Sequence, residues 1–165
     1  MAKFAPIQKP GRSEQSVGTD PKFIAAVVRR FGPLVIDLAA SHENAQAPNY
    51  LTEEDDSFAH DWSAPTWPRG NRWLNPPFSH IAPWALKCAE YACARDIVDA
   101  NSPLLFLVPA GVGANWFRDH VADKARVLFL NGRLTFVGYN HPYPKDCMLC
   151  IYGDAPGYEV WSWQQ

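Results

Sequence analysis

Apolar and polar residues follow two different periods along the chain, and these periods predict helices and strands in turn. Between Thr19 and Gly32 the apolar side chains recur at helical spacing, behind a capping Asp20 and a proline at the first helical position. A short apolar strand is expected at 34–41, and a second one ends at Leu74, directly before two prolines.

The second half of the chain is richer in strand patterns. The expected elements are a helix from Ser79 or His80 towards Ala100, a strand buried on both faces at 104–108, a short helix from Ala114 to Val121, and strands at 126–130, 134–137, 147–152 and 158–163. Asn131-Gly132 is a tight-turn signal between two of these strands.

Composition places the chain among globular proteins. Its 165 residues are 47% hydrophobic and 19% charged, which suits one domain with a real core. The net charge of −2 gives no overall attraction to a polyanion. Residues 1–18 lack periodicity and are predicted to form a flexible arm, which leaves 19–165 as the domain. Without a long apolar span or a leader, we expect no membrane contact and a cytoplasmic location.

The four cysteines favour buried free thiols over a metal site. Cys88 and Cys93 are five apart on an expected helix and so do not share a face. Cys147 and Cys150 have C-x-x-C spacing, but on a strand positions i and i+3 point to opposite faces. No metal is therefore expected, and a reducing compartment fits.

The stretch Asn75-Pro76-Pro77-Phe78 carries the most specific chemistry. Proline lacks a backbone N–H and forces the preceding residue into extended geometry. The stretch therefore offers a rigid row of acceptors, the Asn75 side-chain oxygen and a prolyl carbonyl, beside an aromatic ring. A planar exocyclic amine needs two such acceptors and an aromatic partner for its π-face. An ordinary strand-to-loop turn is the alternative interpretation.

Carboxylates near the first strand form a second candidate site. The stretch 34–41 is a short apolar strand that ends in an acid, Asp37, and then small residues, and ligands of open α/β sheets gather at the carboxyl ends of strands. A structural turn aspartate is the alternative. The acidic run 53–56 and Asp61 read as a solvated face by composition, although carboxylates downstream of the first strand also suit a ribose diol.

With these segments in place, the chain resembles the small phage-type DNA N6-adenine methyltransferases, the Dam-like family, over nearly all residues after 18. The similar segments are Thr19, Phe31-Gly32, Asp37 to Ser41 with Asn44, Tyr50 to Asp56, Asp61-Trp62, Asn75 to Phe78 with Trp84, Val108 to Ala110, and Gly132 to Phe136. The Asn75 to Phe78 stretch is similar to the (N/D/S)-P-P-(Y/F) motif of amino-group methyltransferases. Asp37-Leu38-Ala39-Ala40 departs from the glycine-rich cofactor loop of larger relatives.

The resemblance implies an α/β, Rossmann-like class I methyltransferase fold, with a single mixed, mostly parallel sheet flanked by helices. It implies methyl transfer from S-adenosylmethionine to adenine N6 in DNA, with the base flipped from the duplex. Catalytic residues are then Asn75, Pro76, Pro77 and Phe78. Cofactor contacts are expected from Thr19, Asp37, Ala39, Ala40, Asp55, Asp56 and Asp61. Methylation of cytosine N4 or a protein glutamine amide, or an idle DNA-binding module, are the alternatives.

The DNA surface has to be predicted from placement, because the net charge gives no guidance. The linker 138–146 combines aromatic and basic residues, and arginines flank the motif strand or lie in a later turn. The expected DNA contacts are Arg69, Arg72, Arg133, Tyr139, His141, Tyr143 and Lys145. Alternatively, the tyrosines pack under the loop and the arginines are solvated. A monomer and a homodimer both remain open, and a phage-encoded protein would act in the host cytoplasm.

Overall fold

The computed structural model describes residues 17–98 and 101–165. In chain order the elements are α1 (Pro21–Phe31), β1 (Leu34–Asp37), β2 (Asn49–Tyr50), the short 3₁₀ helix η1 (Ser57–Ala59), β3 (Asn71–Leu74), α2 (Ile81–Val98), β4 (Leu104–Pro109), α3 (Asn115–His120), β5 (Arg126–Asn131), β6 (Cys147–Tyr152) and β7 (Gly157–Ser162).

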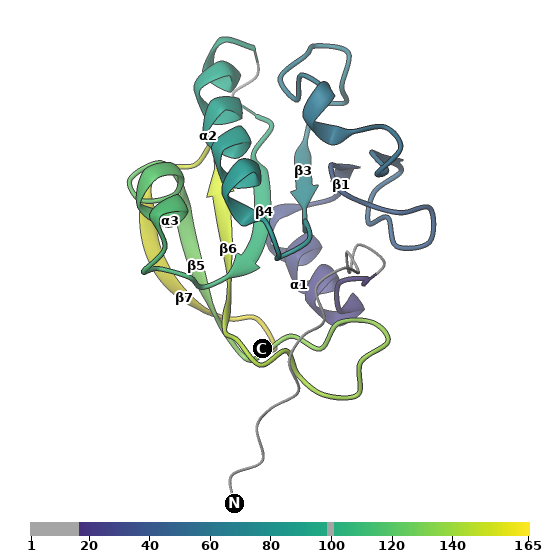
Figure 1. The fold of residues 1–165 in the computed structure, drawn as a ribbon, viewed down its shortest axis with the longest axis vertical. Coiled ribbons are helices and arrows are strands. Elements are labelled where there is room, and N and C mark those ends of the chain that lie inside the picture. The colour runs from purple at the N-terminus through teal and green to yellow at the C-terminus, as the bar shows by residue number, and fades with distance from the viewer. Residues whose placement is uncertain (1–16, 99–100) are drawn as a thin grey trace, which may run out of the picture.

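These strands form one seven-stranded sheet in the order β2-β1-β3-β4-β6-β5-β7 (Figure 1). Strand β6 is antiparallel to both of its neighbours, and the remaining pairs are parallel. The predicted Rossmann-like arrangement, a single mixed and mostly parallel sheet flanked by helices, is confirmed. All the strands of this sheet except β6 therefore end at the same edge, here called the carboxyl edge.

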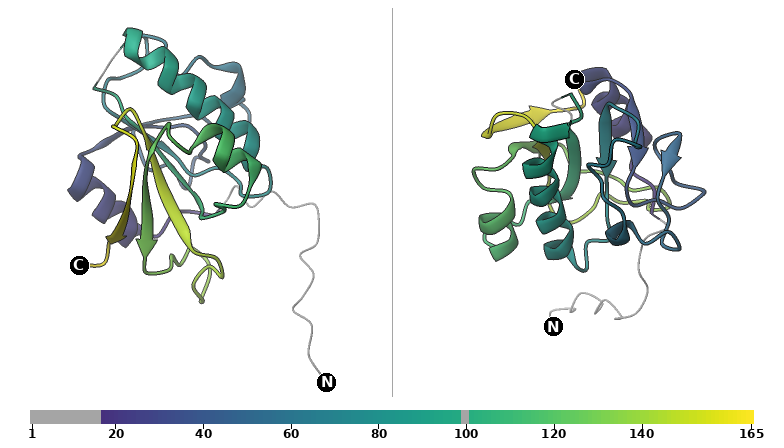
Figure 2. Two further views of the ribbon diagram at one scale, coloured as in Figure 1. Left: turned by 90° about the vertical axis from the view of Figure 1, so that its left-hand side faces the viewer. Right: turned by 90° about the horizontal axis from the view of Figure 1, so that it is seen from above.

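Helices cover both faces of the sheet, with α1 on one side and α2 and α3 on the other (Figure 2). Successive side chains of β4 divide between two cores, because strand side chains alternate between faces. Phe106 and Val108 pack on the α2 side, whereas Leu105 and Leu107 pack on the α1 side. The continuous apolar run of β4 is buried throughout, as predicted.

Helix α1 begins and ends where the sequence predicts. The Asp20 carboxylate accepts a hydrogen bond from the Lys22 N–H at 2.8 Å, and proline occupies the first turn. Gly32 ends the helix with a φ of 92°, which a side chain would make unfavourable, and its N–H donates to the Val28 carbonyl. Phe23 and Val27 face the sheet and are fully buried.

Cys147 and Cys150 lie on opposite faces of β6, as predicted from their spacing. Cys147 belongs to the core under α1 and Cys150 to the core under α2. Burial raises the pKa of the Cys147 thiol to about 12, so it stays protonated at neutral pH. Cys88 is buried on α2 and Cys93 is exposed. Within the described residues no group of three or more histidines, cysteines or carboxylates is arranged to hold a metal.

The predicted strand at 134–137 is wrong, because these residues lie in the loop 132–146 that joins β5 to β6. The Val137 N–H donates to the Gly18 carbonyl at 2.9 Å, and the Tyr143 N–H donates to the Leu134 carbonyl at 2.7 Å. The backbone thus bonds to the N-terminal segment and across the loop instead of to a strand. Leu134 and Phe136 are buried all the same, which explains their strand-like alternation.

Two predictions concern the margins of the described ranges. Residues 1–16 of the predicted arm, and the predicted helix end at Ala100, lie outside the described residues. Val17 packs against the core under α1, and Gly18 is buried, so both belong to the folded domain. Across residues 17–98 and 101–165, no helix has the length and apolar character that a membrane crossing requires.

Candidate active site

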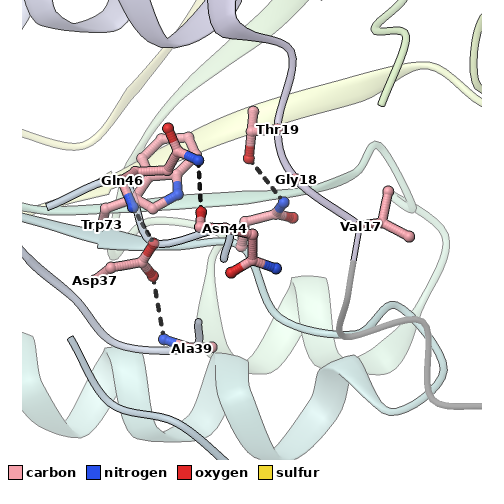
Figure 3. Close-up of a pocket in the computed structure, with 9 residues that line it drawn as sticks. Val17, Gly18, Thr19, Asp37, Ala39, Asn44, Gln46 and Trp73 are labelled. Atoms are coloured by element: carbon pink, nitrogen blue, oxygen red, sulfur yellow. Dashed lines mark hydrogen bonds between the residues drawn. The ribbon is translucent and has the colours of Figure 1, made fainter. Parts of the chain in front are cut away.

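A small hollow lies at the carboxyl edge, where β1 and β3 end side by side (Figure 3). The hollow opens to solvent, and the empty space at its mouth and inside it is together about 190 Å³. Its lining consists of Val17, Gly18, Thr19, Asp37, Ala39, Asn44, Gln46, Trp73 and Asn75. Because Asp37 pairs with Trp73 in parallel register, the topology brings the predicted catalytic and cofactor residues to one place.

The Asn75 side chain is held by Thr19. Its Nδ2 donates to Thr19 Oγ1 at 2.9 Å, and the Thr19 side chain is almost fully buried, with the residue 3% exposed. Since the amide nitrogen points at Thr19, the amide oxygen faces away from it. Pro76 is buried, and Pro77 and Phe78 are half-buried, so the motif is packed into the domain. These contacts leave Asn75 arranged to accept a hydrogen bond from a ligand.

Asp37 is a buried carboxylate, 2% exposed, at the end of β1. It accepts hydrogen bonds from the backbone N–H groups of Gln46 at 3.0 Å and Ala39 at 3.3 Å (Figure 3). Desolvation by burial raises the pKa of Asp37 to about 6, and the two hydrogen bonds oppose this shift. Asp37 thus organises the turn after β1, and a cation in the hollow would favour its ionised form.

The turn after β1 is closed by further polar groups that sequence reasoning did not assign to a site. Asn44 Oδ1 accepts from the Ser41 N–H at 2.7 Å, and Gln46 Nε2 donates to the Asn44 carbonyl at 2.6 Å. Ala40, a predicted cofactor residue, donates its N–H to the Leu51 carbonyl and does not line the hollow. The signal for Asn44 and Gln46 was their position just after the first strand, at the edge where ligands gather.

The three predicted ribose carboxylates do not line the hollow. Asp55 and Asp56 follow β2 at the same sheet edge, and Asp61 comes after η1. All three are exposed and accept hydrogen bonds within their own turns. The pairs are Asp55 with the Thr52 N–H and hydroxyl, Asp56 with the Phe58 N–H, and Asp61 with the Ser63 N–H and hydroxyl. These bonds lower the pKa values of Asp55 and Asp61. Asp55 and Asp61 therefore stay ionised at neutral pH, and all three side chains are exposed to solvent.

Two aromatic rings from the loop 132–146 pack against Phe78. Its ring centroid lies 5.8 Å from that of Phe136 and 5.6 Å from that of Tyr143, and those two rings are 5.6 Å apart. All three contacts are edge-to-face, a favourable arrangement for aromatic pairs. Tyr143, a predicted DNA contact, is therefore half-buried against the motif, as the alternative interpretation predicted for the tyrosines. Its ring connects the loop 132–146 to the site.

Of the other predicted DNA contacts, some lie on this loop and some at the opposite edge. Tyr139, His141 and Lys145 are exposed on the loop. Arg133 is exposed at its root, where its Nε lies 3.2 Å from Asp146 Oδ1. Arg69 is exposed just before β3 begins, at the far end of that strand from Asn75.

The predicted DNA contact of Arg72 is wrong, because its side chain is inside the protein. It is 4% exposed, and its guanidinium donates to the carbonyls of Trp62 and Gly70, both at 3.3 Å. The guanidinium also lies over the Tyr91 ring, 5.2 Å from the centroid. Arg72 thus stabilises the start of β3, where no nucleotide could reach it.

The sheet order and the polar motif at the end of β3 define a class I methyltransferase domain. A family model described as DNA N-6-adenine-methyltransferase (Dam) matches residues 12–147, and the chain belongs to this family.

Three curated relatives are similar over parts of the chain. A DNA N-6-adenine-methyltransferase of Escherichia phage T1 is 26% identical over 142 residues, which are 86% of this chain and 56% of that protein. A putative methyltransferase, YfdM of Escherichia coli strain K12, is 35% identical over 81 residues, 46% of this chain and 85% of that protein. A DNA N-6-adenine-methyltransferase of Haemophilus phage HP1 is 23% identical over 103 residues, 62% of this chain and 54% of that protein.

The chain thus spans about half the length of the two phage proteins it matches. No solved structure shows significant similarity to it.

Proposed function

We propose that this chain transfers a methyl group from S-adenosylmethionine to the exocyclic N6 amine of adenine in DNA. The observation that carries the proposal is the geometry of Asn75: its amide nitrogen bonds Thr19, so its oxygen faces away, beside a hollow bounded by Asp37. Membership of the Dam family, and the names of the phage relatives, support adenine in DNA as the acceptor.

The acceptor side of the reaction follows from hydrogen-bond chemistry. The adenine amine is a weak nucleophile because its lone pair is delocalised into the ring. The Asn75 oxygen and the Pro76 carbonyl accept its two N–H donors, which draws the nitrogen towards a pyramidal geometry and localises the lone pair. Phe78 stacks on the flipped base, and its ring is set in place by the loop 132–146.

In this proposal the polar, amino-acid end of S-adenosylmethionine binds at the hollow, whose lining is polar. Gly18 and Ala39 are small and allow close approach, and the Asp37 carboxylate suits a cationic group. The hollow is small and opens to solvent, so in this proposal the rest of the cofactor lies along the open edge of the sheet. Asp55 and Asp56, after β2 at that edge, remain our proposed ribose partners. When bound, the cofactor supplies an electrophilic methyl group on a sulfonium.

DNA approaches from the side of the loop 132–146 in this proposal. Lys145, His141 and Tyr139 are exposed on that loop, and Tyr143 links it to Phe78. We propose that residues 17–165 form the methyltransferase domain, because Val17 packs on the core and Gly18 is buried, and we expect either a monomer or a homodimer. The expected place of action is the cytoplasm, that of the host if the chain is phage-encoded.

Mass spectrometry of digested DNA tests the proposal directly. DNA is incubated with the full chain and isotope-labelled S-adenosylmethionine, and we expect the label in N6-methyladenine. Label in N4-methylcytosine would show that cytosine, and not adenine, is the acceptor. Label in protein would indicate that the acceptor is a glutamine amide. Cofactor binding without any transfer would support the idle DNA-binding module. The Asn75→Ala variant, which keeps the fold but loses one acceptor, is the matched control.

A further inference from the structure

We infer that Thr19 is a positioning residue, which holds the Asn75 amide by its nitrogen so that the oxygen faces the target amine. The inference rests on the proposed function, and it differs from the cofactor contact that the family resemblance implies for Thr19. An asparagine amide has nearly the same shape in its two orientations, but only the oxygen accepts a hydrogen bond from an amine. Something must therefore fix which end faces the substrate.

Thr19 is suited to this task because its own position is fixed on both sides. Before it, the Gly18 carbonyl accepts from the Val137 N–H at 2.9 Å. After it, Asp20 caps α1 through the Lys22 N–H at 2.8 Å. The Thr19 side chain is buried and Asn75 is half-buried, so the 2.9 Å bond between Asn75 Nδ2 and Thr19 Oγ1 is partly shielded from water.

Loss of the hydroxyl would leave the half-buried Asn75 N–H donor against an apolar group in place of its partner, which is unfavourable. The amide would then turn its nitrogen towards the open hollow, where water can accept from it. In that orientation the Asn75 N–H groups face the N–H groups of the target amine, so no hydrogen bond forms and the arrangement is unproductive. Thr19 therefore acts on the rate through Asn75 and has no required contact with the cofactor.

The decisive experiment compares Thr19→Val with Thr19→Ser, since valine keeps the shape and serine keeps the hydroxyl. We expect Thr19→Val to lower kcat by about tenfold, the rate equivalent of one unsatisfied donor that is partly buried. Thr19→Ser should stay within about threefold of wild type, and thermal melting confirms that both variants fold. Calorimetry should give the same cofactor Kd, within about twofold, for all three proteins. If Thr19→Val raises the cofactor Kd with kcat unchanged, Thr19 is a cofactor ligand and the inference is overturned.

A double-mutant cycle with Asn75→Asp sharpens the test. A carboxylate is an acceptor at both ends, so its orientation does not matter and Thr19 can donate to it. Thr19→Val should then cost less in kcat in the Asn75→Asp background than in wild type. Equal costs in both backgrounds would mean that Thr19 is merely structural.

One readout does not depend on activity. Hydrogen exchange of the Asn75 side-chain amide, followed by NMR, should be slow in wild type and Thr19→Ser and faster in Thr19→Val. Equal exchange in all three overturns the inference even if the wild-type chain methylates DNA. Conversely, a wild-type chain that transfers no methyl group, but shows this exchange pattern, would remove the proposed function and leave the Thr19–Asn75 contact standing.

Discussion

The two ends of β3 each carry an asparagine, and the two side chains serve different purposes. Asn71, at the start of the strand, donates its Nδ2 to the carbonyls of Phe31 at 2.8 Å and Pro33 at 3.1 Å. These bonds tie the turn between α1 and β1 to the sheet. Asn75, just after the strand, bonds one side chain and lines a hollow. Chain direction alone decides which asparagine meets a ligand, because ligands gather where parallel strands end.

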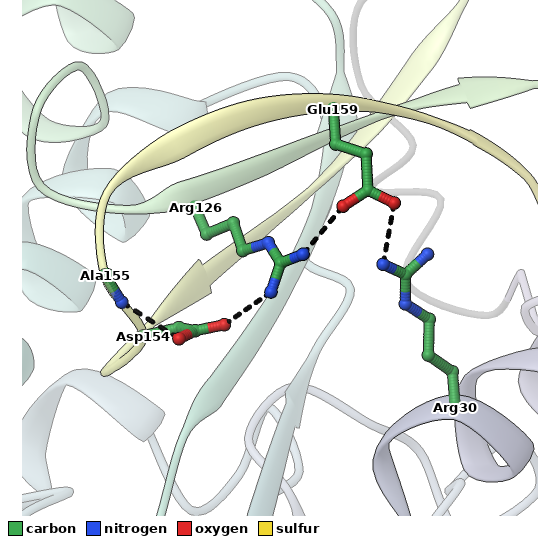
Figure 4. A network of polar contacts seen from close by, with 5 residues as sticks. All are labelled: Arg30, Arg126, Asp154, Ala155 and Glu159. Carbon is green, nitrogen blue, oxygen red and sulfur yellow. Dashed lines mark hydrogen bonds and ion pairs between the residues drawn. The ribbon is translucent and has the colours of Figure 1, made fainter.

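Charged side chains also differ between the two edges of the sheet. At the edge where β5 begins, Arg126 lies 3.0 Å from Asp154 and 2.7 Å from Glu159, and Glu159 lies 2.8 Å from Arg30 of α1 (Figure 4). The four side chains pair with one another and join the last strand to the first helix. At the carboxyl edge, the buried Asp37 is bonded by neutral N–H groups instead. The network where β5 begins holds a strand and a helix together, whereas Asp37 is a carboxylate whose ionisation a ligand can influence.

The largest effect on methyl transfer should come from replacing Asn75 at the end of β3, whereas replacing Asn71 at its start should affect only stability. Asn75→Ala should reduce methyl transfer by about 10²–10³-fold, the usual cost of one preorganised polar group, with cofactor affinity nearly intact. Asn71→Ala should lower the melting temperature because two hydrogen bonds are lost, but leave kcat of the folded protein unchanged. Steady-state kinetics and thermal melting separate the two. An Asn75→Ala variant with near-normal turnover would contradict amine methylation at this site.

Asp37 should make the carboxyl edge sensitive to pH. Its pKa is raised from 3.8 to about 6, so the protein is stabilised while Asp37 is protonated, and this stabilisation is lost as the pH rises towards and through 6. The loss amounts to about 3 kcal/mol, at about 1.4 kcal/mol per pKa unit. Denaturant unfolding between pH 4 and 7 should therefore show wild type losing stability relative to Asp37→Asn. A constant difference would show that Asp37 does not titrate in this range.

The same residue links pH to cofactor binding. A cation beside Asp37 favours the carboxylate, so affinity for S-adenosylmethionine should increase as the pH rises through about 6. Calorimetry across this range measures the effect, and Asp37→Ala should bind the cofactor more weakly at neutral pH. Unchanged binding by Asp37→Ala would reduce Asp37 to a structural role in the turn after β1.

On the loop 132–146, single substitutions should distinguish residues that position Phe78 from residues that contact DNA. Tyr143→Ala should lower kcat by about three- to tenfold, since it removes an edge-to-face contact on Phe78 worth about 0.5–1.5 kcal/mol. Tyr143→Phe keeps the ring and is the control. Lys145→Ala should instead raise the KM for DNA and reduce the salt slope of binding by about one. The double alanine variant should show both changes. If DNA affinity and its salt slope stay the same, the DNA-facing surface lies elsewhere.

The smallest effect is expected at the opposite edge. Glu159→Gln removes the shared carboxylate of the ion-pair network, which lies at the surface, so the melting temperature should fall only slightly. The difference between variant and wild type should shrink at about 1 M salt, because salt screens exposed charges. Methyl transfer should be unaffected. A marked fall in kcat would show that the two edges are coupled.

The features that the sequence determined are those set by neighbouring residues. The α1 helix follows from its cap and its glycine stop, and the end of β3 follows from proline sterics at Asn75-Pro76-Pro77. The placement of Asp37 and Asn75 at one edge also follows from strand order in an α/β sheet, once both are recognised as strand ends. For these, a few adjacent residues contain the whole physical cause.

Tertiary structure decided everything that depends on distant partners. Thr19 and Asn75 are 56 positions apart, and no local pattern announces their hydrogen bond. Arg72 looks like a surface arginine in the sequence, but two backbone carbonyls and the Tyr91 ring surround it. The apolar alternation at 134–137 reports burial, which a loop packed on the core satisfies as well as a strand does. Sequence pattern encodes which side chains avoid water, and only the folded chain decides which groups they meet.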